Sequence, residues 1–116
     1  MNLKIIPTPE FQKSVKKLFK RYKLIAKDLA ILEKELNQET HTGIDLGNHC
    51  FKLRLPNSSV PTGKSGGFRV IYFLKTEEAI YLLAIYSKSD LESIDEKRLV
   101  EIIKDNKLYE IPNIKS

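Results

Sequence analysis

The chain has 116 residues, of which 41% are hydrophobic and 30% are charged, a composition that predicts one globular domain over residues 1–116. It contains no apolar run long enough to cross a membrane and no signal-peptide core, so we expect a cytoplasmic protein. The single cysteine, Cys50, excludes an internal disulfide and cannot by itself form a zinc site.

Basic residues outnumber acidic residues, with 20 Lys and Arg against 15 Asp and Glu and a net charge of +5. This excess favours an anionic partner such as a nucleic acid. The charge is polarised along the chain, because residues 12–27 contain basic side chains and no acidic ones, whereas acidic residues are frequent over 92–105.

The amino-terminal third predicts a strand and two helices. An apolar run over Leu3–Ile6, ended by Pro7, predicts a strand at a sheet edge. Thr8 then begins a helix as its cap, with a proline in the first turn. Apolar residues continue this helix at the spacing of one helical face, namely Phe11, Val15, Leu18, Phe19 and Tyr22. A second helix is predicted over 24–37, and we expect the two helices to form an antiparallel hairpin.

The middle of the chain predicts a loop followed by a strand with one open face. Residues 38–48 are polar and contain glycines, which indicates a loop. In the segment Cys50–Leu55 apolar and basic residues alternate. This alternation predicts a half-buried strand that displays Lys52 and Arg54 on its open face.

The carboxyl-terminal half predicts two further strands and a helix. A loop over 56–63 leads to a strand over Gly67–Lys75, and a tight turn leads to another over Ala79–Tyr86 that is apolar on both faces. An apolar stripe within residues 90–106 predicts the last helix.

This order of elements predicts an α+β fold. We expect two amino-terminal helices and a carboxyl-terminal helix around a mainly antiparallel sheet of three to four strands. The helices should cover one face of the sheet, because the alternating strand leaves the other face polar.

Five basic residues are predicted to gather on that polar face. If the strands containing Lys52, Arg54 and Arg69 pair, these side chains lie together, with Lys64 at the rim and Lys88 after the next strand. Like charges repel unless an anion neutralises them, so the group is typical of a site for a phosphate backbone. Arginine offers a planar, two-pronged donor to phosphate, and a lysine among other cations loses its proton more easily.

Arg69 is the most informative of these residues, because a guanidinium inside an apolar strand needs a defined partner. Gly66 and Gly67 precede this strand and would let an anionic partner, such as a nucleic acid, approach the backbone. Tyr86, which comes shortly before Lys88, could stack on a base.

Other chemistries find little support in the sequence. His41 and His49 could act as an acid and base pair, but nothing fixes their approach. The histidine and cysteine content has no metal-ligand spacing, and we expect no cofactor.

The segments Phe51–Leu55, Gly63–Phe73 and Leu82–Lys88 resemble the RelE/ParE toxin superfamily, and within it the HigB-like RelE toxins. The fold plan of that superfamily also has two amino-terminal helices, a central sheet and a closing helix. The resemblance implies a toxin of a bacterial type II toxin-antitoxin system that cuts translated mRNA in the A site of the 70S ribosome. Its other partner would be a helix-turn-helix antitoxin.

The resemblance also implies roles for individual residues in an attack by the 2′-hydroxyl on the adjacent phosphate. Arg69 would hold the scissile phosphate, while Lys52 and Arg54 would supply the base and stabilise charge. Lys64 would contact RNA backbone, and Lys88 would protonate the leaving oxygen.

RelE has an arginine one position beyond the lysine that matches Lys88, where this chain has Ser89, and a tyrosine for which this chain has no clear counterpart.

Two alternatives stay open at the level of sequence. A ParE-like inhibitor of DNA gyrase would share the fold without cleaving RNA. A non-catalytic module that binds RNA or a protein would share the basic surface.

Overall fold

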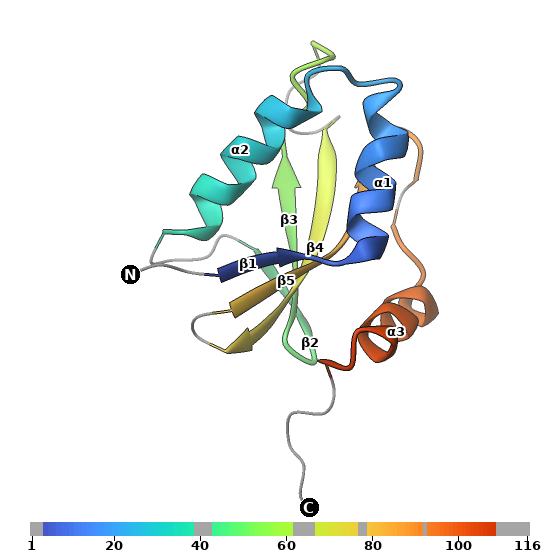
Figure 1. The fold of residues 1–116 in the computed structure, drawn as a ribbon. Helices are drawn as coiled ribbons and strands as arrows, with labels where there is room; N and C mark the ends of the chain where they lie inside the picture. The colour runs from blue at the N-terminus through green and yellow to red at the C-terminus, as the bar shows by residue number, and fades with distance from the viewer. Residues whose placement is uncertain (1–3, 39–42, 62–66, 77–78, 92, 109–116) are drawn as a thin grey trace, which may run out of the picture.

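The computed structural model describes residues 4–38, 43–61, 67–76, 79–91 and 93–108 (Figure 1). Within them the chain forms three helices and five strands. In chain order these are β1 (Lys4–Pro7), α1 (Pro9–Phe19), α2 (Ile25–Leu36), β2 (Ile44–Gly47), β3 (Cys50–Leu55), β4 (Phe68–Thr76), β5 (Ala79–Ser87) and α3 (Glu96–Asp105). The predicted α+β class is confirmed.

The strands form one mainly antiparallel sheet in the order β1-β5-β4-β3-β2. The exception is β1, which pairs in parallel with β5 at the sheet edge. This edge position agrees with Pro7 at the end of β1, because proline has no N–H to donate to a further strand.

The strand β2 lies in the segment that the sequence predicts as a loop, and it brings the sheet to five strands instead of three to four. Both residues between β2 and β3, Asn48 and His49, have positive φ angles, of 52° and 67°. Two residues with positive φ form the type I′ turn that joins adjacent antiparallel strands. Asn48 tolerates positive φ better than most residues, but the turn pair Asn48-His49 is not one of the common Asn-Gly or Asp-Gly pairs, so the sequence reading passed over this hairpin.

Thr8 joins the start of α1 to the sheet. Its hydroxyl accepts a hydrogen bond from the Phe11 N–H at 3.2 Å, which confirms it as the helix cap. The same hydroxyl donates to the Leu82 carbonyl at 2.8 Å, and the Thr8 N–H donates to that carbonyl at 3.1 Å. This buried contact fixes α1 over β5.

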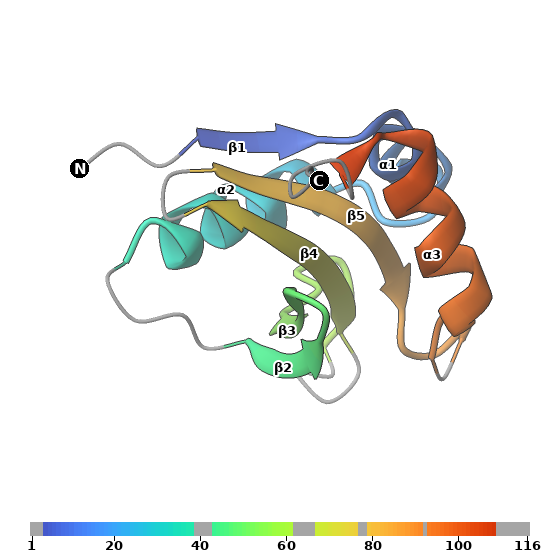
Figure 2. The same cartoon turned by 90° about the horizontal axis from the view of Figure 1, so that it is seen from below.

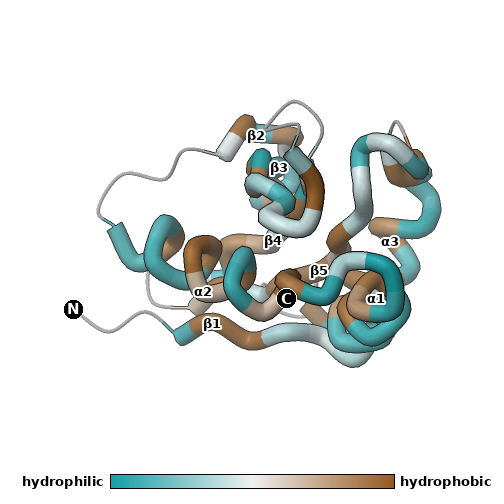
Figure 3. Tube along the Cα trace, turned by 90° about the horizontal axis from the view of Figure 1, so that it is seen from above, coloured by the Kyte–Doolittle hydropathy of each residue, from teal (hydrophilic) through white to brown (hydrophobic). Residues whose placement is uncertain are grey.

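The helices α1 and α2 diverge from their connection and do not pair along their length (Figure 1), so the predicted hairpin is wrong. Each helix instead buries apolar side chains on the same face of the sheet, among them Phe11 from α1 and Leu32 from α2. The tube in Figure 3 alternates between hydrophobic and hydrophilic residues along α1, as an amphipathic helix does.

The helix α3 packs on the opposite face, so the prediction that all helices cover one face is also wrong. Ile102 and Ile103 of α3 contact a second apolar cluster that includes Ile71 and Leu83. Both faces of β4 and β5 are apolar, so the second face also needs a cover. The helix α3 provides it and keeps these strand residues from water.

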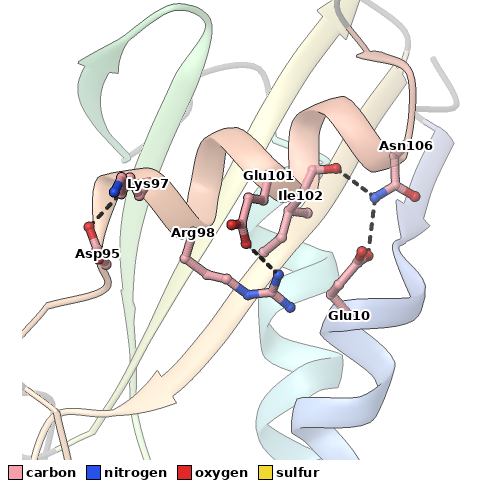
Figure 4. A network of polar contacts seen from close by, with 7 residues as sticks. All are labelled: Glu10, Asp95, Lys97, Arg98, Glu101, Ile102 and Asn106. Atoms are coloured by element: carbon pink, nitrogen blue, oxygen red, sulfur yellow. Dashed lines mark hydrogen bonds and ion pairs between the residues drawn. The ribbon is translucent and has the colours of Figure 1, made fainter.

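Polar contacts hold α3 at both ends (Figure 4). Asp95 caps its start by accepting from the Lys97 N–H at 3.1 Å. The Asn106 amide donates to the Ile102 carbonyl at 2.8 Å and to the Glu10 carboxylate of α1 at 3.1 Å.

Asp28 anchors the chain that follows β3. Its carboxylate is fully buried and accepts from the Ser58 N–H at 3.0 and 3.2 Å and from the Ser58 hydroxyl at 2.5 Å. A buried carboxylate needs such partners, because leaving it unpaired costs several times the net free energy of one hydrogen bond.

Replacing Asp28 by alanine should lower the free energy of unfolding by about 2 to 3 kcal/mol, because charge-assisted hydrogen bonds are lost and the Ser58 N–H is left without its acceptor. Urea denaturation measures this change. Glu33→Ala is the control, since Glu33 is an exposed acid on the same helix and its loss should change stability by less than about 0.5 kcal/mol. Equal effects of the two substitutions would contradict the anchoring role.

Candidate nucleic-acid site

Arg54, Arg69 and Tyr86 form one row across the middle of the sheet. Arg54 of β3 lies directly opposite Arg69 of β4, which lies directly opposite Tyr86 of β5. Residues that oppose each other in antiparallel strands have Cα atoms about 5 Å apart and point to the same face. The two guanidinium groups are therefore direct neighbours.

Lys52 lies on the same face as this row, two residues before Arg54 in β3 and opposite Ile71 of β4. We call Lys52, Arg54 and Arg69 the cation face. Lys88 lies beside it, just after β5, where its N–H donates to the Gly67 carbonyl at 2.9 Å and closes the end of the β4–β5 pair. Lys64 and Gly66 lie outside the described residues.

The cation face combines an exposed arginine with a buried one. Arg54 is exposed, whereas Arg69 is only 6% exposed and donates from Nη1 to the Phe68 carbonyl at 3.3 Å. Burial lowers the pKa of Arg69, Arg54 lowers it further, and Tyr86 acts in the opposite direction. An anion that approaches the two arginines would therefore stabilise the charged form of Arg69.

Tyr86 is only 7% exposed, so its ring does not offer the open face that stacking on a base requires. Its hydroxyl is buried and has no hydrogen-bond partner among the residues that the structure describes. Burial raises the pKa of this hydroxyl, and Arg69 opposes the rise. A contact with RNA stays a prediction for Tyr86, through the hydroxyl and not through stacking.

Gly67 has a structural reason to be glycine. It is buried at the start of β4, and a Cβ there would collide with the Leu55 carbonyl oxygen and lie 3.2 Å from the Asn57 nitrogen. Two backbone segments therefore approach each other at this position. The predicted role of Gly67 toward RNA is not needed to explain the residue.

A cleft of about 280 Å³ opens on the same face of the sheet as the cation face. We call it the α3 cleft, because residues of α3 line one side and residues of the β2–β3 hairpin line the other. Figure 2 shows the ribbons of α3 and of this hairpin. Its lining includes Lys52 and Tyr86, so it adjoins the cation face. The sequence reading missed the cleft, because most of its other lining residues come from β2 and its turn, which were predicted as a loop, and from α3 and the residues just before it, which were placed on the wrong face.

Hydrogen bonds and an ion pair hold the segment that carries Lys88. The Ser87 hydroxyl lies 3.4 Å from the Tyr22 hydroxyl and 2.9 Å from that of Ser89. Asp90 accepts from Arg21 at 2.7 Å. The contacts from Tyr22 and Arg21 join residues more than sixty positions apart in sequence, and no local pattern could have indicated them.

The family of the chain follows from a comparison with family models. Residues 7–111 match the family described as the RelE toxin of the RelE/RelB toxin-antitoxin system. The chain belongs to the RelE toxin family. It is thus a toxin of a RelE/RelB system, and a RelB-type antitoxin is its implied partner. No curated protein matches the chain.

The toxin offers little else for catalysis in its described residues. They contain no group of three His, Cys, Asp or Glu side chains that could hold a metal ion. His49 is exposed and packs edge-on against Phe73 at 6.0 Å, and His41 lies outside the described residues. Burial, with a contribution from Asp45, raises the pKa of the Cys50 thiol to about 11, so the thiol stays protonated and unreactive. None of the described helices is long and apolar enough to span a bilayer.

If Arg54 and Arg69 repel each other, Arg54→Met should stabilise the RelE toxin at low salt. We expect the free energy of unfolding to rise by about 0.5 kcal/mol, because like charges on directly opposed residues destabilise a sheet. The gain should shrink at high salt, which screens the repulsion. Arg98→Met is the control, since Arg98 faces Glu101 at 3.1 Å and its loss removes an attraction. A loss of stability in Arg54→Met at low salt would contradict this interpretation.

Gly67→Ala should destabilise the toxin by about 1 to 3 kcal/mol, because the added methyl group forces the backbone of β4 away from Leu55. Thermal unfolding in the absence of RNA measures this effect. Unchanged stability would mean that the glycine serves RNA binding alone.

Proposed function

We propose that this RelE toxin is a ribosome-dependent endoribonuclease, which cleaves translated mRNA in the A site by attack of a 2′-hydroxyl on the adjacent phosphate. The observation that carries the proposal is the direct pairing of Arg54 and Arg69 on a sheet face that also holds Lys52. Family membership supports it, because the family consists of toxins of the RelE/RelB system.

The arginines suit the phosphate that is cleaved. During the attack the phosphate gains negative charge on its non-bridging oxygens, and guanidinium groups fixed in a sheet stabilise that charge without reorganising. The apolar strand and the hydrogen bond to the Phe68 carbonyl fix the Arg69 guanidinium in one position, which suits it to hold the phosphate. Arg54 adds a second positive charge from the exposed side.

Lysines take the proton-transfer steps. Lys52 accepts the proton of the 2′-hydroxyl as the new bond to phosphorus forms. The bond between phosphorus and the 5′-oxygen breaks, and Lys88 donates a proton to that leaving oxygen. Both lysines are half-buried and flank the row of Arg54, Arg69 and Tyr86 on opposite sides, since Lys52 precedes Arg54 on β3 and Lys88 follows Tyr86 beyond β5. We assign them to the two proton transfers for this reason.

The ribosome supplies the alignment that this chemistry needs. In-line attack requires the 2′-hydroxyl, the phosphorus and the leaving oxygen to be held in one geometry, which is worth several powers of ten in rate. A message fixed in the A site offers that geometry to an open sheet face. The same proposal places the toxin in the cytoplasm and within the HigB-like RelE toxins.

Arg69→Ala should reduce cleavage of translated message by more than about 100-fold, because the charge on the transition state loses its main donor. Primer extension after in vitro translation, compared with untranslated message, measures cleavage. Arg69→Lys should restore only part of it, since lysine keeps the charge without the two-pronged donor. Lys34→Ala is the control, because Lys34 is exposed on α2, on the other face of the sheet, and its loss should leave cleavage unchanged.

A gyrase assay separates the competing functions. Inhibition of supercoiling with intact message would overturn the nuclease proposal in favour of a ParE-like inhibitor. Toxicity that persists in a folded Arg69→Ala variant would overturn it in favour of a non-catalytic binding module.

A further inference from the structure

The turn that follows β5 fixes the backbone of Lys88. The Ser87 carbonyl accepts from the Asp90 N–H and from the Leu91 N–H, both at 3.0 Å, so the chain reverses directly after the strand. Lys88 is the first residue of this turn, and its N–H donates to the Gly67 carbonyl at 2.9 Å. The turn therefore determines where the side chain of Lys88 begins.

Strand alternation places Ser87 and Lys88 on opposite faces of the sheet. Ser87 lies opposite Phe68, and Tyr22 packs edge-on against the Phe68 ring at 5.5 Å, so Ser87 belongs to the face of the main core. Lys88 comes two residues after Tyr86, which lies on the same side of the sheet as the cation face. Residues two apart in an extended chain point to the same side, which directs Lys88 toward the cation face.

The residues just after α1 reach both ends of this turn from the face of the main core. The hydroxyl of the buried Tyr22 lies 3.4 Å from the Ser87 hydroxyl, which lies 2.9 Å from that of Ser89. Arg21 donates to the Asp90 carboxylate at 2.7 Å, and its guanidinium lies 5.0 Å from the centre of the Tyr22 ring. We call Arg21, Tyr22, Ser87 and Asp90 the turn clamp.

Stability alone does not explain the turn clamp. Arg21 and Asp90 are exposed, and exposed ion pairs add little to stability. Ser87 is buried at the end of a row formed with Leu55 and Phe68, where an apolar side chain would pack without needing a partner. Hydrogen bonds, unlike apolar contacts, fix a direction. The clamp therefore serves the geometry of the turn more than its stability.

Geometry matters at this turn because of the role of Lys88 in the proposed cleavage. A general acid must come within hydrogen-bond distance of the oxygen that it protonates. Lysine has a flexible four-carbon stem, so the position of its backbone limits the region that its amine can reach. A misplacement of about 1 Å can cost about 100-fold in rate.

We propose that the turn clamp holds Lys88 in place for the protonation of the leaving oxygen, which makes Arg21, Tyr22, Ser87 and Asp90 positioning residues of the toxin. The proposal rests on the proposed function for the role of Lys88. In that step the Lys88 ammonium gives its proton to the 5′-oxygen as the bond from phosphorus to that oxygen breaks. The clamp residues exchange no proton and act only through the turn.

A message with sulfur in place of the leaving 5′-oxygen tests the proposal, because a thiolate leaves without a proton. Both messages are cleaved on programmed ribosomes with saturating toxin. Asp90→Asn and Tyr22→Phe should each slow the ordinary message about threefold to tenfold, with the half-saturating toxin concentration unchanged. They should cleave the sulfur message at close to the wild-type rate. Equal losses on the two messages would overturn the proposal.

Three comparisons accompany these variants. Lys88→Ala should show the same dependence on sulfur with a larger loss, whereas Arg69→Ala should slow both messages because it acts on the phosphate. Arg21→Asp combined with Asp90→Arg exchanges the charges of the ion pair and should recover most of the rate that each single change loses.

The control breaks an exposed ion pair elsewhere. Glu101→Gln removes the contact between Arg98 and Glu101, at 3.1 Å on α3, and should leave the cleavage of both messages unchanged. A loss as large as that of Asp90→Asn would overturn the proposal, since it would show that any exposed ion pair has this effect.

Side-chain NMR tests the turn clamp without ribosomes. In toxin labelled at lysine, the relaxation of the Lys88 Cε should show more motion in Asp90→Asn and in Tyr22→Phe than in wild type, while Lys34 on α2 stays unchanged. This result in a toxin that leaves message intact would overturn the nuclease and support the clamp. Wild-type cleavage and unchanged Lys88 motion in both variants would overturn the clamp and support the nuclease.

Discussion

The central constraint in this toxin is the placement of two arginines directly opposite each other on neighbouring strands. Arg54 and Arg69 occupy one register position of the β3–β4 pair, and like charges there destabilise the sheet. The apolar strands that surround them hold the pair in place, because β4 and β5 are buried along most of their length. In the function that we propose, an anionic phosphate would bind both guanidinium groups and offset this repulsion.

The rest of the structure supports this arrangement from both faces. On one face α1 and α2 bury the main core, and Thr8 and Asp28 tie those helices to β5 and to the chain after β3. On the other face α3 covers only part of the sheet and leaves Arg54 exposed, with the α3 cleft opening beside Lys52. Because the chain continues from β5 through Lys88 into α3, one segment supplies a charged residue and a wall of the cleft.

Much of the site could be predicted from local pattern. The alternation of Cys50–Leu55 correctly places Lys52 and Arg54 on one side, since strand side chains alternate between faces whatever the fold. The long apolar run after Gly67 correctly indicates a central strand with Arg69 in it. Because this run is apolar on both sides, it also indicates that helices pack on both faces of the sheet. The sequence reading nevertheless predicted all helices on one face. The β2 strand was missed because the polar composition of this segment indicates a loop. The hairpin turn depends on positive φ angles at Asn48 and His49, which composition does not reveal.

The sequence by itself determined the class of the fold, the cap at Thr8 and the presence of basic residues on one side of a strand, because these follow from periodicity and from bonds within a few residues. Tertiary structure alone decided that Arg54 meets Arg69, that Tyr86 is buried with its hydroxyl facing no partner in the described chain, and that α3 closes a cleft beside Lys52. Those relations join strands and helices far apart in the chain, and their register is set by how apolar faces of whole elements pack.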